Sequence, residues 1–99
     1  MIDRVHLFKF RAAHSDEPTR ERLADDVHAK LLPHVSSKGW ELRVGVPAAV
    51  EAAKAWDLMV NLSFATRAEE LGAGAALDEA LASVRERSEV EKHWSFSRR

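Results

Sequence analysis

Two histidines, an arginine and an asparagine have the types and spacing to act on a small molecule. His6 and His93 each stand in a stretch of alternating side chains, IDRVHLFKFR and VEKHWSFS. A neutral imidazole in such a stretch can act as a general base near pH 7. Arg43 could pair with an anion, and Asn61 could donate to an oxyanion. This set would suit base-catalysed chemistry on a small carbonyl or carboxylate compound.

Each of these residues also has a purely structural interpretation. A buried histidine is often satisfied by a neighbour in its sheet, and Arg43 can form an interfacial ion pair with Glu41. Asp25 and His28 lie one helical turn apart, but a metal centre needs three or more converging ligands, so no metal site is predicted. The chain has no cysteine, and no serine stands in a nucleophile-elbow pattern.

The spacing of apolar residues predicts the elements that must position these side chains. Strands alternate with a period of two, and amphipathic helices repeat every three or four residues. The predicted strands are residues 2–11, 40–47, 56–65 and 90–97, and the predicted helices are residues 15–32 and 66–87. The Ala-rich segment 48–55 is long enough for a helical turn.

Capping and breaking residues set the predicted helix ends. Ser15 is a predicted N-cap, with acidic residues in the following turn. Pro33 is predicted to end that helix, because its ring disfavours helical backbone in the preceding residue. The segment Thr66–Glu69 has the form of a capping box. Gly72 and Gly74 follow, and each costs about 1 kcal/mol inside a helix, so a kink or two segments is predicted.

The order β-α-β-β-α-β predicts an α+β, ferredoxin-like fold. Two right-handed crossovers place both helices on one face of a four-stranded antiparallel sheet. The strand residues predicted to meet the helices are Val5, Leu7, Leu42, Val44, Val46, Leu58, Val60, Leu62, Trp94 and Phe96.

The same alternation leaves the opposite sheet face uncovered, with apolar and polar side chains mixed. Its predicted members are His6, Phe8, Phe10, Glu41, Arg43, Met59, Asn61, Ser63, His93 and Ser95. Large apolar side chains in one exposed patch usually mark an interaction site. A homodimer with sheets packed face to face would bury Phe8, Phe10 and Met59. It would also enclose a cavity in which Arg43, Asn61, Ser63, Glu41 and Met59 could bind a small molecule.

Composition limits the classes of partner. The chain of 99 residues is expected to form one domain spanning residues 1–99. Its 15 Lys and Arg nearly balance its 16 Asp and Glu, so nucleic acid is not an expected partner. No apolar run approaches the roughly 20 residues of a membrane span. A cytoplasmic protein with no membrane partner is therefore expected.

Three segments carry a resemblance to a known family. MIDRVHLFKF, LLPHVSSKGWELRVG and WDLMVNLSFATRAEEL, spread over residues 1–71, resemble the stress-responsive A/B barrel (Dabb) family of the dimeric α/β-barrel superfamily. The resemblance implies ferredoxin-like subunits whose sheets pair into a homodimeric barrel. It implies little about chemistry, because many members have no assigned activity, and it implies no organic cofactor.

One segment departs from the family pattern. The second helix of the family often carries a Tyr and a His-Pro-x-His cluster, whereas the corresponding stretch here reads LGAGAALDEAL. The histidines that serve as a base in plant cyclases of this family have no counterpart in this helix. Activity by that route is not expected.

Three functional hypotheses follow from the sequence. The first is a Dabb-like homodimer of unassigned activity that binds at most a small molecule between its subunits. The second is a cofactor-free isomerase, cyclase or monooxygenase that uses His6 or His93 as base and Arg43 with Asn61 as anion holders. The third is a sealed dimer that serves as a binding module for another protein.

Overall fold

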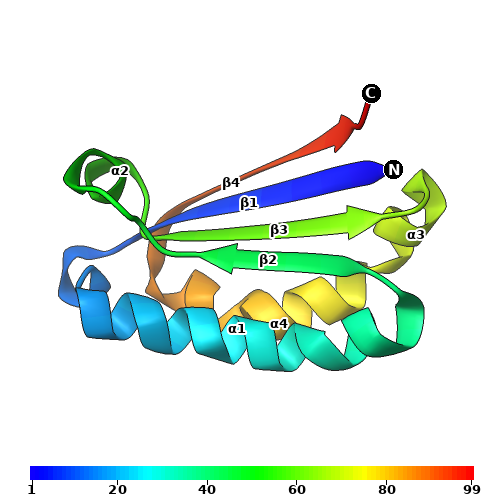
Figure 1. Ribbon diagram of the computed structural model, residues 1–99. Coiled ribbons are helices and arrows are strands. Elements are labelled where there is room, and N and C mark those ends of the chain that lie inside the picture. The colour runs from blue at the N-terminus through cyan, green and yellow to red at the C-terminus, as the bar shows by residue number, and fades with distance from the viewer.

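The computed structural model describes residues 1–99 and has two layers, a sheet and a pair of long helices that cover one of its faces (Figure 1). The strands are β1 (Ile2–Phe10), β2 (Glu41–Gly45), β3 (Leu58–Phe64) and β4 (Ser88–Ser97). The helices are α1 (Glu17–Lys38), α2 (Val50–Ala55), α3 (Arg67–Gly72) and α4 (Gly74–Arg87), and a short 3-10 turn spans Ala12–His14. No helix has the length and apolar character needed to span a membrane.

The sheet has the strand order β2-β3-β1-β4, and every neighbouring pair is antiparallel. Helices α1 and α4 lie together against one face, which we call the helix side. The short helix α2 lies beyond the strand ends, away from α1 and α4 (Figure 1). The other face, which we call the open face, carries no long helix. The predicted ferredoxin-like α+β fold is confirmed.

Helix α1 is longer than predicted, and its N-cap lies one residue after the predicted Ser15. Its N-cap is Asp16, whose carboxylate accepts from the Thr19 amide at 2.9 Å. Pro33 was wrongly expected to end it, because the helix runs on to Lys38. A proline inside a helix removes one backbone hydrogen bond and usually kinks or breaks the helix, and here the flanking turns hold it together. Gly39 closes the helix in the left-handed conformation, at φ 72°, with its amide donating to the Val35 carbonyl.

The segment after β3 forms two helices rather than one, as the glycines predicted. The Thr66 hydroxyl caps α3 by accepting from the Glu69 amide at 3.2 Å. Ala73 lies buried at the junction, and α4 begins at Gly74. This break lets α3 turn Glu70 inward while α4 presents a separate apolar stripe to the sheet.

The core lies between the helix side of the sheet and α1 with α4. Direct partners across an antiparallel pair share a face, so the pairs His6 with Val60 and Phe8 with Leu58 place these side chains on the helix side. The buried apolar core consists of Phe8, Phe10, Leu23, Val27, Leu31, Trp40, Leu58, Val60, Leu62, Phe64, Ala73, Leu77, Ala80, Leu81 and Val84.

The predicted facing was right for β2 and β3 but wrong for β1 and β4. Val5 and Leu7 lie on the open face opposite Asn61 and Met59, while Phe8 and Phe10 are core residues. The odd-numbered and the even-numbered residues of β1 both include bulky apolar side chains. Alternation alone therefore did not show which set faces the core. On β4, Trp94 pairs with Val5 and Phe96 pairs with Asp3, so both aromatic side chains also lie on the open face. Val46 follows β2 and is exposed.

A buried carboxylate ties the end of β1 to α1 and β3. Asp57 accepts from the Phe10 amide at 2.7 Å, the Ser15 hydroxyl at 2.7 Å and Arg20 Nε at 2.8 Å. Burial would raise the pKa of Asp57, but these hydrogen bonds outweigh it and hold the pKa below its usual value. Lys9 Nζ lies 3.6 Å away and completes the charge balance.

We expect Asp57→Ala to lower the free energy of unfolding by about 3–5 kcal/mol, because it leaves buried hydrogen-bond donors and a cation without their acceptor. Urea unfolding followed by circular dichroism measures this loss. Asp25→Ala is the matched control, since Asp25 is exposed on α1, and it should stay within about 0.5 kcal/mol of wild type. A loss below about 1 kcal/mol for Asp57→Ala would contradict this account of the junction.

Candidate functional site

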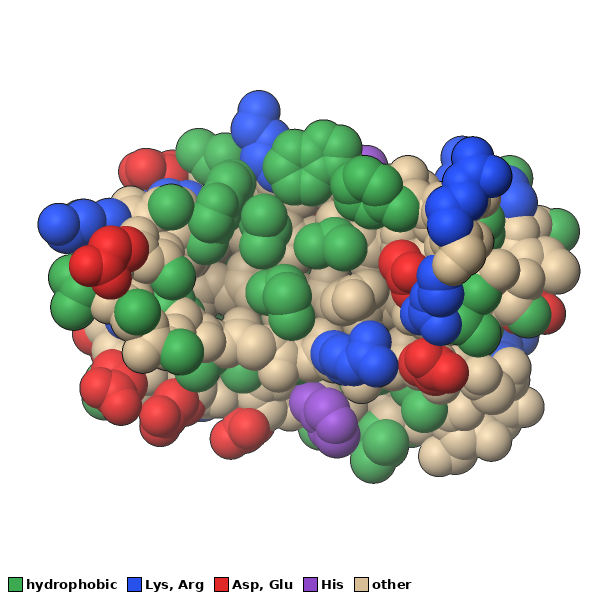
Figure 2. All heavy atoms as spheres, turned by 45° about the horizontal axis from the view of Figure 1, so that its top comes forward, with side chains coloured by type: hydrophobic (Ala, Val, Ile, Leu, Met, Phe, Trp, Pro, Cys, Tyr) green, Lys and Arg blue, Asp and Glu red, His purple; other side chains and the backbone are tan.

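The open face of the sheet is the part of the molecule that most needs a partner. Hydrophobic side chains gather over its middle, with charged side chains around them (Figure 2). Trp94 and Phe96 are 46% and 57% exposed, in a protein whose core aromatics are nearly inaccessible. The apolar members on or beside this face are Val5, Leu7, Val46, Trp56, Met59, Val90, Trp94 and Phe96.

A charged cluster lies on this face near the two chain ends. Arg98 Nη2 donates to Asp3 at 2.7 Å and to the Ser63 hydroxyl at 3.3 Å. The Ser63 hydroxyl in turn donates to Asp3 at 2.5 Å. Hydrogen bonds from Arg98 and Ser63 lower the pKa of Asp3 to about 2. Asp3, Ser63 and Arg98 therefore satisfy one another within the protomer.

The centre of the open face is not satisfied within the protomer. Arg43 and Asn61 are direct cross-strand partners. Asn61 Oδ1 is buried and has no hydrogen-bond partner. Arg43 is exposed and forms no ion pair, not even with Glu41 on the same strand. A buried polar atom without a partner, such as Asn61 Oδ1, is uncommon in native structures and points to a missing partner. The Arg43 guanidinium is open to solvent and free to bind an anion.

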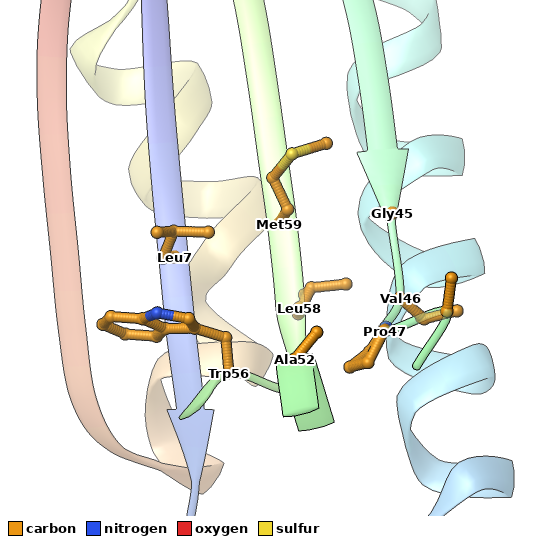
Figure 3. A pocket seen from close by; sticks show the side chains of 9 residues that line it. Leu7, Gly45, Val46, Pro47, Ala52, Trp56, Leu58 and Met59 are labelled. Carbon is orange, nitrogen blue, oxygen red and sulfur yellow. The ribbon is translucent and has the colours of Figure 1, made fainter. Parts of the chain in front are cut away.

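An apolar pocket of about 260 Å³ opens beside this centre, beneath α2. The Trp56 ring lies across β1 on one side, and Val46 and Pro47 close the other (Figure 3). Met59 stands at the end nearest the middle of the strands. The pocket is lined by Leu7, Gly45, Val46, Pro47, Ala48, Ala52, Trp56, Leu58 and Met59.

Gly45 keeps this pocket open on the β2 side. A Cβ at this position would come within 3.3 Å of Met59 Cε. Without it, the Met59 side chain can lie across β2, and methionine adapts its shape readily because it is unbranched. The wall formed by Met59 is therefore adjustable.

The structure brings together the predicted ligand-binding residues Glu41, Arg43, Met59, Asn61 and Ser63 on the open face. Glu41 pairs with Ser63, Arg43 with Asn61, and Gly45 with Met59. Their role in binding stays a prediction. Phe8 and Phe10, which were expected beside Met59 at a dimer interface, are buried under the helices instead.

His6 and His93 lie on the helix side, so their expected position beside Arg43 and Asn61 was wrong. They pair directly with each other across β1 and β4, with ring centroids 5.1 Å apart. The sheet separates them from the open face, because residues at odd spacing along a strand point to opposite sides. A substrate held by Arg43 and Asn61 cannot be deprotonated by either histidine.

His6 is inaccessible and fully hydrogen-bonded. Arg4 Nε donates to His6 Nε2 at 2.9 Å, so Nδ1 carries the ring proton and donates to Glu91 at 3.2 Å. Burial lowers the pKa of His6 to about 4, although the Glu91 hydrogen bond opposes this shift. No pocket reaches the His6 side chain.

Two acidic residues complete this network, Glu91 on β4 and Glu70 on α3. The Glu91 carboxylate accepts hydrogen bonds from Arg85 Nε at 2.9 Å and from Arg85 Nη2 at 3.2 Å. Glu70 is fully buried and accepts from Arg67 and from the Ser95 hydroxyl. Burial would raise the pKa of both carboxyl groups, but their hydrogen bonds outweigh it and lower both pKa values.

Metal-ligating atoms of His6, Glu91 and His93 lie within 4.8 Å of one another. Two histidines and a glutamate can bind zinc. However, a metal-bound histidine normally donates its second ring N–H to an acceptor, and His6 Nε2 instead faces the Arg4 donor. Glu91 is already paired with Arg85. The geometry therefore favours a hydrogen-bonded network over a metal centre.

Sequence reasoning missed the acidic members of this network and the pocket under α2. A signal for Glu70 was present, because it stands three residues before Ala73 and seven before Leu77 on one helical stripe. A charged residue in an apolar stripe indicates a buried ion pair. Trp56 carried no comparable signal, since its role depends on where α2 folds.

No family model matches this sequence, and no curated protein matches it. Solved structures do share its fold. A dimeric ferredoxin-like protein of unknown function from Bacteroides fragilis has a TM-score of 0.79 at 11% identity, covering 98% of this chain and 95% of that one. A dimeric ferredoxin-like protein of unknown function from Thermobifida fusca has a TM-score of 0.71 at 17% identity, covering 98% and 90%. An Arabidopsis thaliana protein has a TM-score of 0.75 at 12% identity, covering 100% and 96%.

The low pKa of His6 predicts a pH-dependent stability. Between the unfolded value near 6.5 and the folded value of about 4, the unfolded chain binds a proton that the folded protein does not. Stability should therefore be fully present above pH 6.5 and fall by about 3 kcal/mol from this group as the pH drops to 4.

We expect His6→Gln to remove this part of the pH dependence. Urea unfolding gives the free energy of unfolding of wild type and variant at pH 7 and at pH 4. The loss of free energy between the two pH values should be larger for wild type than for His6→Gln. His28→Gln, on the exposed side of α1, should keep the wild-type dependence. An equal loss of stability in wild type and His6→Gln between these pH values would show that His6 does not carry the effect.

Proposed function

We propose that this protein is a homodimer of the Dabb type whose open sheet faces pack against each other and enclose a small-molecule binding cavity. The observation that carries the proposal is that one face holds both exposed aromatic side chains and a buried amide oxygen, Asn61 Oδ1, without a partner. The β1 and β4 residues on that face differ from those expected from the sequence, whereas the β2 and β3 residues are the expected ones, and the mixed character of the face is as predicted.

The apolar side chains support a protein partner. Trp94 and Phe96 stand two residues apart on β4, with Val5 and Leu7 beside them on β1. Contiguous apolar surface of this kind is uncommon on monomers. A second copy is the partner we favour, because a two-fold axis lets one self-complementary patch cover both subunits. The dimeric proteins from Bacteroides fragilis and Thermobifida fusca share the fold.

The free edge of β4 supports the same partner. This strand has ten residues, bonds only to β1, and contains no proline. An exposed edge with aromatic side chains is prone to aggregate unless something covers it. Closing two sheets into one barrel would cover it.

Binding rather than catalysis fits the positions of the candidate groups. The cation and amide that could hold a ligand lie on the open face, whereas the histidines lie on the helix side. His6 is saturated by Arg4 and Glu91. The proposed role is therefore that of a binding protein, with the Dabb family as its proposed membership.

We expect Trp94→Glu to shift the protein from dimer to monomer. A buried aromatic anchor at an interface contributes about 2 kcal/mol or more, and a buried unpaired carboxylate adds a further cost. Sedimentation velocity over a concentration series should give twice the 11.1 kDa chain mass for wild type and the chain mass itself for the variant.

Leu32→Glu is the control, because Leu32 has the same 46% exposure as Trp94 but lies on α1. It should remain dimeric. Circular dichroism should show that both variants fold. A wild-type monomer, or a folded Trp94→Glu dimer of undiminished affinity, would count against this interface.

A further inference from the structure

The charge around the pocket beneath α2 indicates which ligand it would accept. Seven of its nine lining residues are hydrophobic, and no acidic residue lines it. At about 260 Å³ it falls just below the usual range for drug-sized ligands. A compact apolar group therefore fits it.

Two free cations flank this pocket on the open face. Arg43 lies two residues before Gly45 on β2, which places it about 7 Å along the strand from the pocket wall. Lys92 pairs across the sheet with Leu7, which lines the pocket. Both side chains are exposed, and neither forms an ion pair.

The acidic groups of the open face lie on the far side of Arg43. Asp3 is bound by Arg98, and neither Asp3 nor Glu41 forms an ion pair with Arg43. Arg43 is thus the cation closest to the pocket along β2 that remains free to bind an anion. Asn61 lies directly across from it, and its side chain carries an Nδ2 donor beside the buried Oδ1 that has no partner in the protomer.

We propose that this pocket binds a small amphipathic carboxylate, with its apolar body between Trp56 and Met59 and its carboxylate on Arg43 and Asn61. An arginine fork can hold a carboxylate through two parallel hydrogen bonds, and an amide N–H can add a third. The inference rests on the proposed dimer only in that the second subunit would roof the pocket, since all these residues belong to one chain.

One ligand would then occupy both the pocket and the anion-binding position beside it, where Arg43 Nη and Asn61 Nδ2 can donate hydrogen bonds to a carboxylate. A neutral apolar ligand would make no use of the Arg43 cation, and a multiply charged one would bring a charge into the apolar space, which is costly. A single anionic head on an apolar tail avoids both costs.

The test compares three probes with the same tail, which are octanoate, 1-octanol and octylamine. Nuclear magnetic resonance of the indole N–H groups reports binding, with Trp56 as the sensor in the pocket wall. Trp40 is the internal control, because it is buried on the helix side against Phe64. We expect octanoate to shift the Trp56 signal at the lowest concentration, octanol at a higher one and octylamine last, with Trp40 unmoved.

Variants separate the two parts of the site. Arg43→Gln should weaken octanoate binding about tenfold and leave octanol unchanged. Ala52→Trp should fill the pocket and weaken both probes. Arg22→Gln, an exposed arginine on α1, is the matched charge control and should behave like wild type.

Several outcomes would overturn the proposal. Equal binding of octanoate and octanol, or an unchanged preference in Arg43→Gln, would remove the carboxylate from the site. A Trp56 signal that responds only in the monomeric Trp94→Glu variant would show that side chains of the second subunit fill the pocket instead of a ligand.

Sedimentation of the same samples keeps the two proposals apart. Carboxylate-selective binding by a monomeric wild type would support the site and reject the dimer. A stable dimer without binding would support the dimer and reject the site.

Discussion

The antiparallel ladder between β1 and β3 is the constraint on which the other features depend. Its register pairs Ile2 with Phe64 and Phe8 with Leu58. Because side chains alternate strictly between the two faces of a sheet, this one register places the whole of β1. Phe8 and Phe10 fill the core, and Val5 and Leu7 are left facing outward. A slip of one residue would exchange the two faces.

This placement commits the protein to buried charge on the helix side. Arg4 and His6 share the face of Phe8, so they enter the layer beneath the helices. Glu70 and Glu91 neutralise that layer, with Arg67 and Arg85 outside them. Such networks often add little net stability over an apolar core, but removing one member leaves a buried charge unpaired. We interpret the network as a device that fixes how α3 and α4 seat on the sheet.

Under the proposed function, the two faces divide structural and binding roles between them. The helix side holds His6 in a closed network that reaches no pocket, with the exposed His93 stacked against it. The open face holds the pocket beneath α2 and the unpaired cations Arg43 and Lys92. A catalytic mechanism that combines groups from both faces would require one substrate to contact side chains on opposite sides of the sheet. This separation is the physical reason for preferring binding to catalysis, and it follows from the register of β1 with β3 and β4.

Sequence alone determined the element order, the break at Gly72 and Gly74, and the mixed character of one sheet face, because these depend on local propensity and periodicity. The sequence also placed Arg43, Asn61 and Met59 on the correct face of the sheet, because only one of the two alternating sets of side chains on β2 and on β3 is clearly apolar. Only the tertiary structure decided which sides of β1 and β4 face the helices. Both alternating sets of side chains on β1 are bulky, and the aromatic side chains of β4 point away from the helices. Alternation specifies that a strand has two faces, but the partner that covers each face comes from distant parts of the fold.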